Sequence, residues 1–88
     1  MPAGYKVLLL DEIFQSLDSL DYHERLRVLD FCSRLGNQPT LHGDYRERGG
    51  DGRSHEVKIV DLYAVAWWVD EAVKEVKVVG CKVADRGM

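Results

Sequence analysis

The segment from Gly43 to Val79 constrains the fold most, because its apolar and polar residues alternate as they do in β-strands. Tyr45–Arg48 is a first candidate strand, and Gly49-Gly50-Asp51-Gly52 supplies residues that tolerate the positive φ angles of a hairpin turn. Further strands are predicted around 56–60, 63–69 and 76–79, with a turn over 70–74. The sequence therefore predicts an antiparallel β-meander in the second half of this 88-residue chain.

The alternation also predicts which side chains share a face of the sheet. Val57 and Ile59 point to one side of their strand, whereas Glu56 and Lys58 point to the other. Near the end of the meander the alternation shifts at Gly80, which is typical of a β-bulge.

The first half of the chain predicts one strand followed by two helices. Tyr5–Leu10 is mostly apolar and suits a buried strand. A first helix is then indicated by apolar residues at helical spacing. These residues are Ile13, Leu17 and Leu20.

A second helix is predicted over Tyr22–Leu35. Asp21 and Glu24 have the spacing of a capping box at its start. Gly36 stands where a left-handed residue commonly ends a helix, and Pro39 blocks its continuation. We therefore expect a tight antiparallel helical hairpin.

This order of elements predicts an α+β fold in a single domain over residues 1–88, with the helical hairpin on one face of the antiparallel sheet. We expect Trp67 in the core and Trp68 on the opposite, open face. There Trp68 either stacks on a base or is buried under a partner or under a tail that flanks the sheet. Residues 85–88 are expected to form a loose tail. The open face is also expected to carry Arg48, Glu56, Lys58, Ala64 and Ala66.

The composition argues against several classes of function. The net charge is −3, so the chain lacks the strongly basic character of most nucleic-acid-binding domains. No apolar run is long enough for a transmembrane helix, and the start lacks a signal-peptide pattern. Cys32 and Cys81 are expected to stay reduced. We therefore expect a cytoplasmic protein without a membrane partner. We expect no metal or cofactor either, because the histidines lack ligand spacing: His23, His42 and His55.

Four cationic residues come close together in the meander, and the residues alone leave two interpretations open. They either form a solvated strand face paired with neighbouring acids, or they contact a partner. These residues are Arg46, Arg48, Arg53 and Lys58. His55 is likewise either a surface residue or an auxiliary acid.

The order and spacing of these segments resemble the RelE/ParE superfamily of bacterial toxins from toxin–antitoxin systems. The resemblance covers about residues 5–83 and implies the same β-α-α-β-β-β(β) fold. It is carried by YKVLL, by the D-x-x-E helix that ends near Asn37-Gln38-Pro39, and by GDYRER, the glycine-rich turn, HEVKI, LYAVAWWVD and EVKVVG.

The resemblance implies two activities. Many members are metal-free endoribonucleases that cut mRNA in the ribosomal A site and so inhibit translation, whereas others poison DNA gyrase. In both branches a cognate antitoxin wraps the toxin and neutralises it. The implied partners are therefore an antitoxin and, for a nuclease, the ribosome and mRNA.

The resemblance also implies roles for particular residues. Metal-free RNA cleavage requires a base, cations that stabilise the phosphorane, and an acid. Lys58 matches a position that is usually basic. Lys82 falls near a position where the nucleases usually carry Arg, with an ordinary exposed lysine as the alternative. Glu56 is the candidate base, with ion pairing as the alternative. Ala64 departs from the pattern, because nucleases commonly carry Arg there. The implied phosphate ligands are Arg46, Arg48 and Arg53.

Two hypotheses follow. The first is an mRNA endoribonuclease that an antitoxin inhibits. The second is a binding module of the same fold, with weak or absent chemistry or with gyrase as its target. The acidic balance and Ala64 favour the second hypothesis, whereas the breadth of the nuclease branch favours the first.

Overall fold

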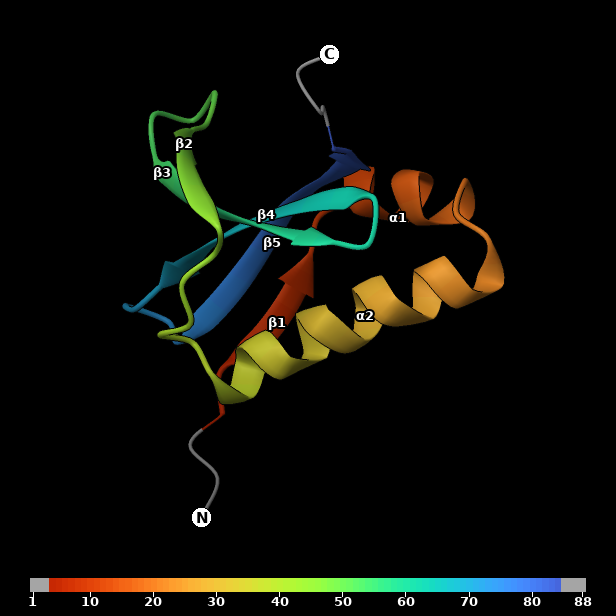
Figure 1. The fold of residues 1–88 in the computed structure, drawn as a ribbon. Helices are drawn as coiled ribbons and strands as arrows, with labels where there is room; N and C mark the ends of the chain where they lie inside the picture. Colours follow the sequence, from red (N-terminus) through yellow and green to blue (C-terminus); the bar gives the residue numbers. More distant parts are fainter. Residues whose placement is uncertain (1–3, 85–88) are drawn as a thin grey trace.

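A computed structural model describes residues 4–84, which form a five-stranded sheet with two helices on one face (Figure 1). The predicted α+β class is therefore confirmed, and the expected tail at 85–88 lies outside the described residues. The elements in chain order are β1 (Lys6–Leu9), α1 (Asp11–Asp18), α2 (Tyr22–Asn37), β2 (Tyr45–Arg48), β3 (Ser54–Val60), β4 (Tyr63–Asp70) and β5 (Glu75–Val83).

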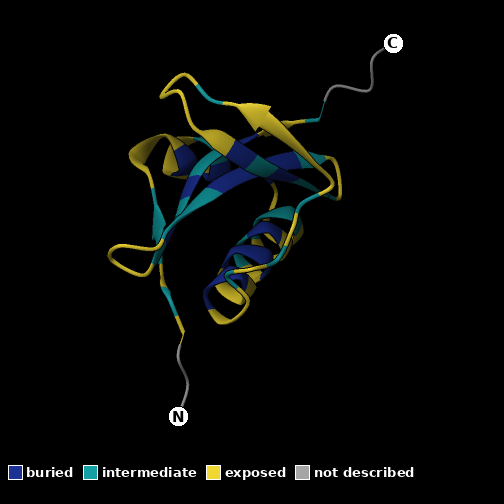
Figure 2. Cartoon of the chain, turned by 90° about the vertical axis from the view of Figure 1, so that its left-hand side faces the viewer, coloured by how far each residue is buried: buried dark blue, intermediate teal, exposed yellow. Residues whose placement is uncertain are grey.

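The strands are ordered β1-β5-β4-β3-β2 across the sheet. Strands β2 to β5 form the predicted antiparallel meander. Strand β1 lies beside β5 and runs parallel to it, an arrangement that the sequence pattern did not predict. At the other edge, all four residues of β2 are exposed (Figure 2).

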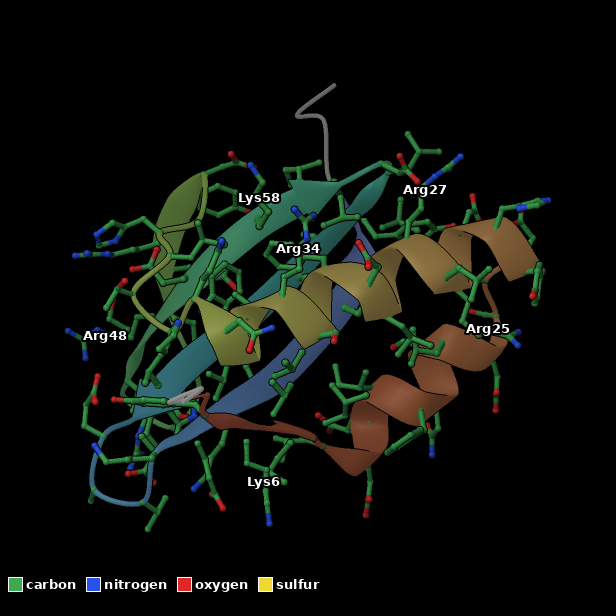
Figure 3. The ribbon with its side chains drawn as sticks, turned by 90° about the horizontal axis from the view of Figure 1, so that it is seen from below. Lys6, Arg25, Arg27, Arg34, Arg48 and Lys58 are labelled. Carbon is green, nitrogen blue, oxygen red and sulfur yellow. The ribbon has the colours of Figure 1, made fainter. Side chains whose placement is uncertain are left out.

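The predicted capping box begins α2. The Glu24 amide donates to Asp21 Oδ1 at 2.8 Å, and the Asp21 amide donates to Glu24 Oε1 at 3.1 Å. Farther along α2, Arg25 donates to the carbonyl oxygens of Leu17 and Leu20 at 3.0 and 3.1 Å. Figure 3 shows Arg25 beside the end of α1. Because helix C-termini leave carbonyl groups unpaired, Arg25 caps α1 and ties the two helices together.

Gly36 does not end α2 in a left-handed conformation, so that prediction is wrong. The helix continues to Asn37, and within residues 4–84 the glycine with positive φ is Gly52. Gly36 instead permits close packing, because its carbonyl accepts a hydrogen bond from the Tyr5 amide at 2.7 Å. A Cβ at position 36 would lie 2.7 Å from the Tyr5 carbonyl oxygen.

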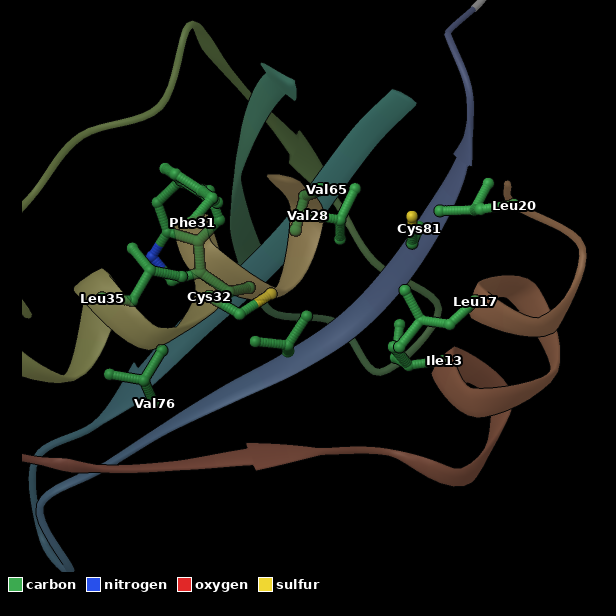
Figure 4. Packing of buried hydrophobic residues seen from close by; sticks show 12 residues of the cluster. Ile13, Leu17, Leu20, Val28, Phe31, Cys32, Leu35, Val65, Val76 and Cys81 are labelled. Atoms are coloured by element: carbon green, nitrogen blue, oxygen red, sulfur yellow. The ribbon is translucent and has the colours of Figure 1, made fainter. Parts of the chain in front are cut away.

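The main core lies between the helices and the sheet. Trp67 is completely buried at its centre, as predicted, and meets Phe31 of α2 edge-on with ring centroids 5.4 Å apart. Figure 4 shows how α1, α2 and the strands converge there. The labelled side chains are Ile13, Leu17, Leu20, Val28, Phe31, Cys32, Leu35, Val65, Val76 and Cys81.

The strand register decides which residues share the helix-covered face, here called the helix face. Directly opposed residues of antiparallel strands point to the same side, and Lys58 opposes Val65 while Glu56 opposes Trp67. Because Val65 and Trp67 belong to the main core, Glu56 and Lys58 lie on the helix face. Their expected place on the opposite face is therefore wrong.

The opposite face, here called the open face, carries a second and smaller apolar cluster. Val57 opposes Ala66, and both pack in this cluster with Ala64. Ile59 opposes Ala64 and joins them. The alternation in β3 was predicted, but its apolar side faces away from the helices. The alanines are on the open face, as expected.

The predicted β-bulge is confirmed. Ala66 pairs with Gly80 and Trp67 pairs with Val78, so Val79 is the extra residue in β5. The bulge resets the alternation, so that Cys81 joins the main core while Lys82, opposite Ala64, faces the open side.

Replacement of Gly36 by alanine tests the packing of α2 on β1. We expect Gly36→Ala to lower the free energy of unfolding by about 1–3 kcal/mol, because backbone atoms must move to admit the methyl group. The measurement is urea unfolding followed by circular dichroism. Gly50→Ala is the matched control, because a Cβ at Gly50 meets no atom within 4 Å. Equal stability of the two variants would contradict this explanation.

Candidate functional site

On the helix face, a carboxylate of β3 and a carboxylate of the α2–β2 connector hold this connector against β3. Glu56 accepts hydrogen bonds from the Gly43 amide at 2.8 Å and from Arg46 Nε at 2.9 Å. Asp44 accepts from the Ile59 amide at 2.8 Å and from Lys58 Nζ at 3.3 Å. We call this pair of carboxylates the connector clamp, because it fixes residues 43–46 along the edge of β3.

The clamp carboxylates have pKa values below their usual range. Burial alone would raise the pKa of Glu56, but hydrogen bonds from the Gly43 amide, Arg46 and His42 outweigh that effect. The Ile59 amide is the main cause of the lowered pKa of Asp44, and Lys58 adds to it. Both groups are therefore held as carboxylates at neutral pH.

The cations of the meander are engaged in different ways. Arg46 and Lys58 pair with the clamp carboxylates. Arg48 donates to the Gly52 carbonyl at 2.9 Å, at the end of the hairpin. Arg53 places its guanidinium 4.1 Å from the centre of the Trp68 ring. Figure 3 shows Arg48 and Lys58 on the side of the molecule away from α1.

The open face contains a groove of about 380 Å³, here called the open-face groove. Its floor consists of small and apolar residues of three strands. These are Val57, Ala64, Ala66, Val79 and Gly80. Its polar rim comes from the start of α1, the β2–β3 hairpin and the end of β5. The rim residues are Glu12, Glu47, Arg48, Asp51, His55 and Lys82.

The predicted site residues therefore do not form one cluster. Lys82 lies on the open-face groove and makes no ion pair or side-chain hydrogen bond within residues 4–84. Glu56, Lys58 and Arg46 lie on the other side of the sheet, in or beside the connector clamp. A single phosphate cannot contact Lys82 and the clamp residues together, because the sheet separates them.

Two residues of the groove form a pair that the sequence did not predict. His55 was expected to be either a surface residue or an auxiliary acid, and it is only 6% exposed. Its Nε2 lies 3.2 Å from Asp51 Oδ2. The four-residue spacing of Asp51 and His55 across a hairpin turn was a signal that the sequence contained, but burial of the ring depends on how the turn folds over it.

Within residues 4–84, no three His, Cys, Asp or Glu side chains converge as metal ligands. In the same range, no helix is long and apolar enough to span a membrane.

The connector clamp makes a prediction about stability and pH. We expect Glu56→Gln to lower the free energy of unfolding at pH 7 by about 1–3 kcal/mol, since the Gly43 amide and Arg46 lose a charged acceptor. Because the folded pKa of Glu56 is lowered, its stabilising effect is present above the unfolded pKa and is lost as the pH falls through the folded value. Stability of the parent chain should thus decline in acid, and Glu56→Gln should decline less.

Denaturant unfolding between pH 7 and pH 3 measures both effects. Glu47→Gln is the control, because Glu47 is exposed on the neighbouring strand and makes no ion pair within the described residues. The clamp is disproved if the two variants have the same stability and the same pH dependence.

The likeness of this chain to known proteins lies in its fold. No protein-family model and no curated protein matches the sequence. A chain of the archaeal RelE–RelB complex from Pyrococcus horikoshii OT3 superposes with a TM-score of 0.78 at 21% identity, covering 96% of this chain and 99% of that one. A chain of the toxin–antitoxin complex RelBE2 from Mycobacterium tuberculosis gives 0.77 at 16% identity, covering 93% and 100%. The protein therefore has the RelE fold.

Proposed function

We propose that this protein is the toxin of a toxin–antitoxin pair and that it acts as a metal-free ribonuclease on mRNA at the ribosome, in the cytoplasm. The observation that carries the proposal is the likeness, over nearly the whole of both chains, to proteins whose structures were solved as RelE–RelB and RelBE2 complexes. The cognate partner would be an antitoxin that covers the chain and blocks its substrate.

The open-face groove is the proposed substrate site. Lys82 carries a positive charge that no acidic side chain within the described residues neutralises, so it is available to a phosphate. In RNA cleavage it would stabilise the negative charge that develops on the phosphorane. Arg48, on the rim, and Arg53, stacked on Trp68, are proposed as contacts to neighbouring phosphates.

The charged residues on the helix face are not part of the proposed catalytic site. Lys58, Glu56 and Arg46 are the remaining residues for which the resemblance implies cleavage or phosphate binding. Each makes an ion pair on the side of the sheet opposite to Lys82. We therefore propose Lys82 as the main catalytic cation, and we assign Glu56 and Lys58 to the connector clamp.

A second function is favoured by the floor of the groove. Val57, Ala64 and Ala66 present methyl groups where a nuclease would need charge, and Ala64 stands where the resemblance implies Arg in a nuclease. These residues suit a binding module of the same fold that contacts its partner without cleaving RNA, including an inhibitor of DNA gyrase.

Induction of the chain alone in bacteria tests the proposal. We expect growth arrest with cleaved mRNA, and we expect Lys82→Ala to reduce the cleavage rate by about 100-fold, a typical cost of removing one charge-stabilising group. Lys58→Ala is the matched control, since Lys58 is engaged with Asp44, and it should retain cleavage. Rates are measured by primer extension on a defined mRNA in a translating extract.

Results that differ from this expectation point to another site, another function or another target. Loss of cleavage in Lys58→Ala but not in Lys82→Ala would move the site to the helix face. Growth arrest with intact mRNA would support the binding module, and cleaved DNA would identify gyrase as the target. Failure of the protein encoded by a neighbouring short reading frame to bind the chain would count against the toxin–antitoxin pair.

A further inference from the structure

A second hollow of the molecule lies where β3 and β4 separate, and the open-face groove does not include it. Strand β3 pairs with β2 from Ser54 but with β4 only from Glu56, whereas β4 stays paired with β5 as far as Asp70. The β2–β3 hairpin therefore turns away from the end of β4 (Figure 1). Between them is a cavity of about 600 Å³, and the connector segment 39–42 forms its third wall. We call it the connector cavity.

The connector cavity has aromatic and apolar walls. Both tryptophans of the chain, Trp67 and Trp68, line it together with Val69, and Pro39 and Leu41 line it from the connector. Within residues 4–84, no strand pairs with Trp68 and Val69 on the side of β3. One of these two residues therefore leaves its backbone amide and carbonyl unpaired at the cavity. A flat ring with polar edges suits such walls.

Several hydrogen-bond donors in the wall lack an acceptor among the described residues. Arg53 is exposed, and its guanidinium makes no ion pair or hydrogen bond there but lies 4.1 Å from the centre of the Trp68 ring. Stacking on a ring uses none of the guanidinium N–H groups, so they stay free for a bidentate contact. The hydroxyls of Thr40 and Ser54 are also without a partner in residues 4–84, and so is the buried Trp67 Nε1.

The acids in the wall, in contrast, already have partners. Glu56 accepts from the Gly43 amide and from Arg46 in the connector clamp. Glu71 accepts from the Tyr5 hydroxyl at 2.6 Å. The wall thus combines free donors with occupied acceptors, and its guanidinium is a cation that no described acid neutralises. Such a wall favours a ligand that is rich in acceptor oxygens and carries a negative charge.

We propose that the connector cavity binds a nucleotide, with the phosphate on Arg53 and the base against the apolar wall. The proposal goes beyond the proposed function, because the cavity lies apart from Lys82 and its occupation requires no cleavage. A guanidinium matches phosphate oxygens in a bidentate way, and aromatic side chains are common partners of an unstacked base. A free nucleotide and a nucleotide unit of an RNA strand both present this chemistry.

Titration of the full-length chain with nucleoside 5′-monophosphates tests the proposal by calorimetry and by intrinsic fluorescence, which should change because both tryptophans line the cavity. We expect Arg53→Gln to weaken binding by at least about 10-fold, as for lost hydrogen bonds to a charged group. Arg34→Gln is the matched control, because Arg34 also lies over an aromatic ring, that of Phe31, at 6.0 Å but does not line the cavity. It should bind like the parent chain.

A second variant tests the cavity without a change of charge. Ser54 is exposed on β3, where a strand tolerates tyrosine, and the larger side chain of Ser54→Tyr would fill the cavity. We expect this variant to stay folded by circular dichroism and to bind nucleotides as weakly as Arg53→Gln. Inorganic phosphate should bind the parent chain at least about 10-fold more weakly than the nucleotides, because it lacks the base.

A short single-stranded RNA separates the two sources of the ligand. Binding of the monophosphates identifies a site for free nucleotides, and Arg53-dependent binding of the RNA alone identifies a site for an RNA strand; both outcomes support the proposal. It is overturned if neither probe binds, or if the parent chain, Arg53→Gln and Ser54→Tyr bind equally well. Equal affinity for phosphate and nucleotide would also overturn it, since the base would then make no contact.

Cleavage of mRNA is measured on the same preparations. Nucleotide binding by a chain that does not cleave mRNA would reject the proposed nuclease function and leave the connector cavity as assigned. Cleavage by a chain that binds no nucleotide in the cavity would reject the cavity assignment alone.

Discussion

The register between β3, β4 and β5 is the constraint on which the rest of the structure depends. It places Lys58, Val65 and Cys81 in one row on the helix face, and Ile59, Ala64 and Lys82 in the next row on the open face. Because side chains alternate strictly along a strand, a shift of one residue would exchange the two faces. The bulge at Val79 is part of this register, since it turns Lys82 toward the groove while Cys81 stays in the core.

The same register explains why charged residues occupy the helix face of β3. Helix α2 covers the sheet near β1 and β5, and the α2–β2 connector runs alongside β3 (Figure 1). Glu56 and Lys58 lie where that connector passes, so their charges are used to bind it. The exposed backbone of a connector needs hydrogen-bond partners, and the Glu56 carboxylate of β3 supplies one for the Gly43 amide. In the other direction, Asp44 of the connector accepts from the Ile59 amide of β3. The charged residues that alternate along β3 therefore serve to hold the connector in place.

Much of the fold was predictable because it depends on local signals. The capping box of Asp21 and Glu24, the hairpin glycines and the bulge near Gly80 each appear within a few residues of one another. The sequence could not predict which side of β3 faces away from the helices. Alternation distinguishes the two sides of a strand but does not show which side meets the helices. The role of Gly36 could not be predicted from the sequence for a similar reason, since the Tyr5 carbonyl that it approaches is distant in the chain. The candidate site depended on these non-local facts, so Lys82 was found, whereas the burial of His55 and its contact with Asp51 were not predicted.

The charge of the open-face groove bears on how it would recognise RNA. Each phosphate that a cation neutralises adds to the affinity and to its salt dependence. The rim of the groove carries the cations Lys82 and Arg48 and the acids Glu12, Glu47 and Asp51. The net charge of the whole chain is −3. Electrostatic attraction to free RNA is therefore small, and affinity must come from contacts that depend on position. Under the proposed function, the apolar floor and a ribosome that presents the strand would supply them.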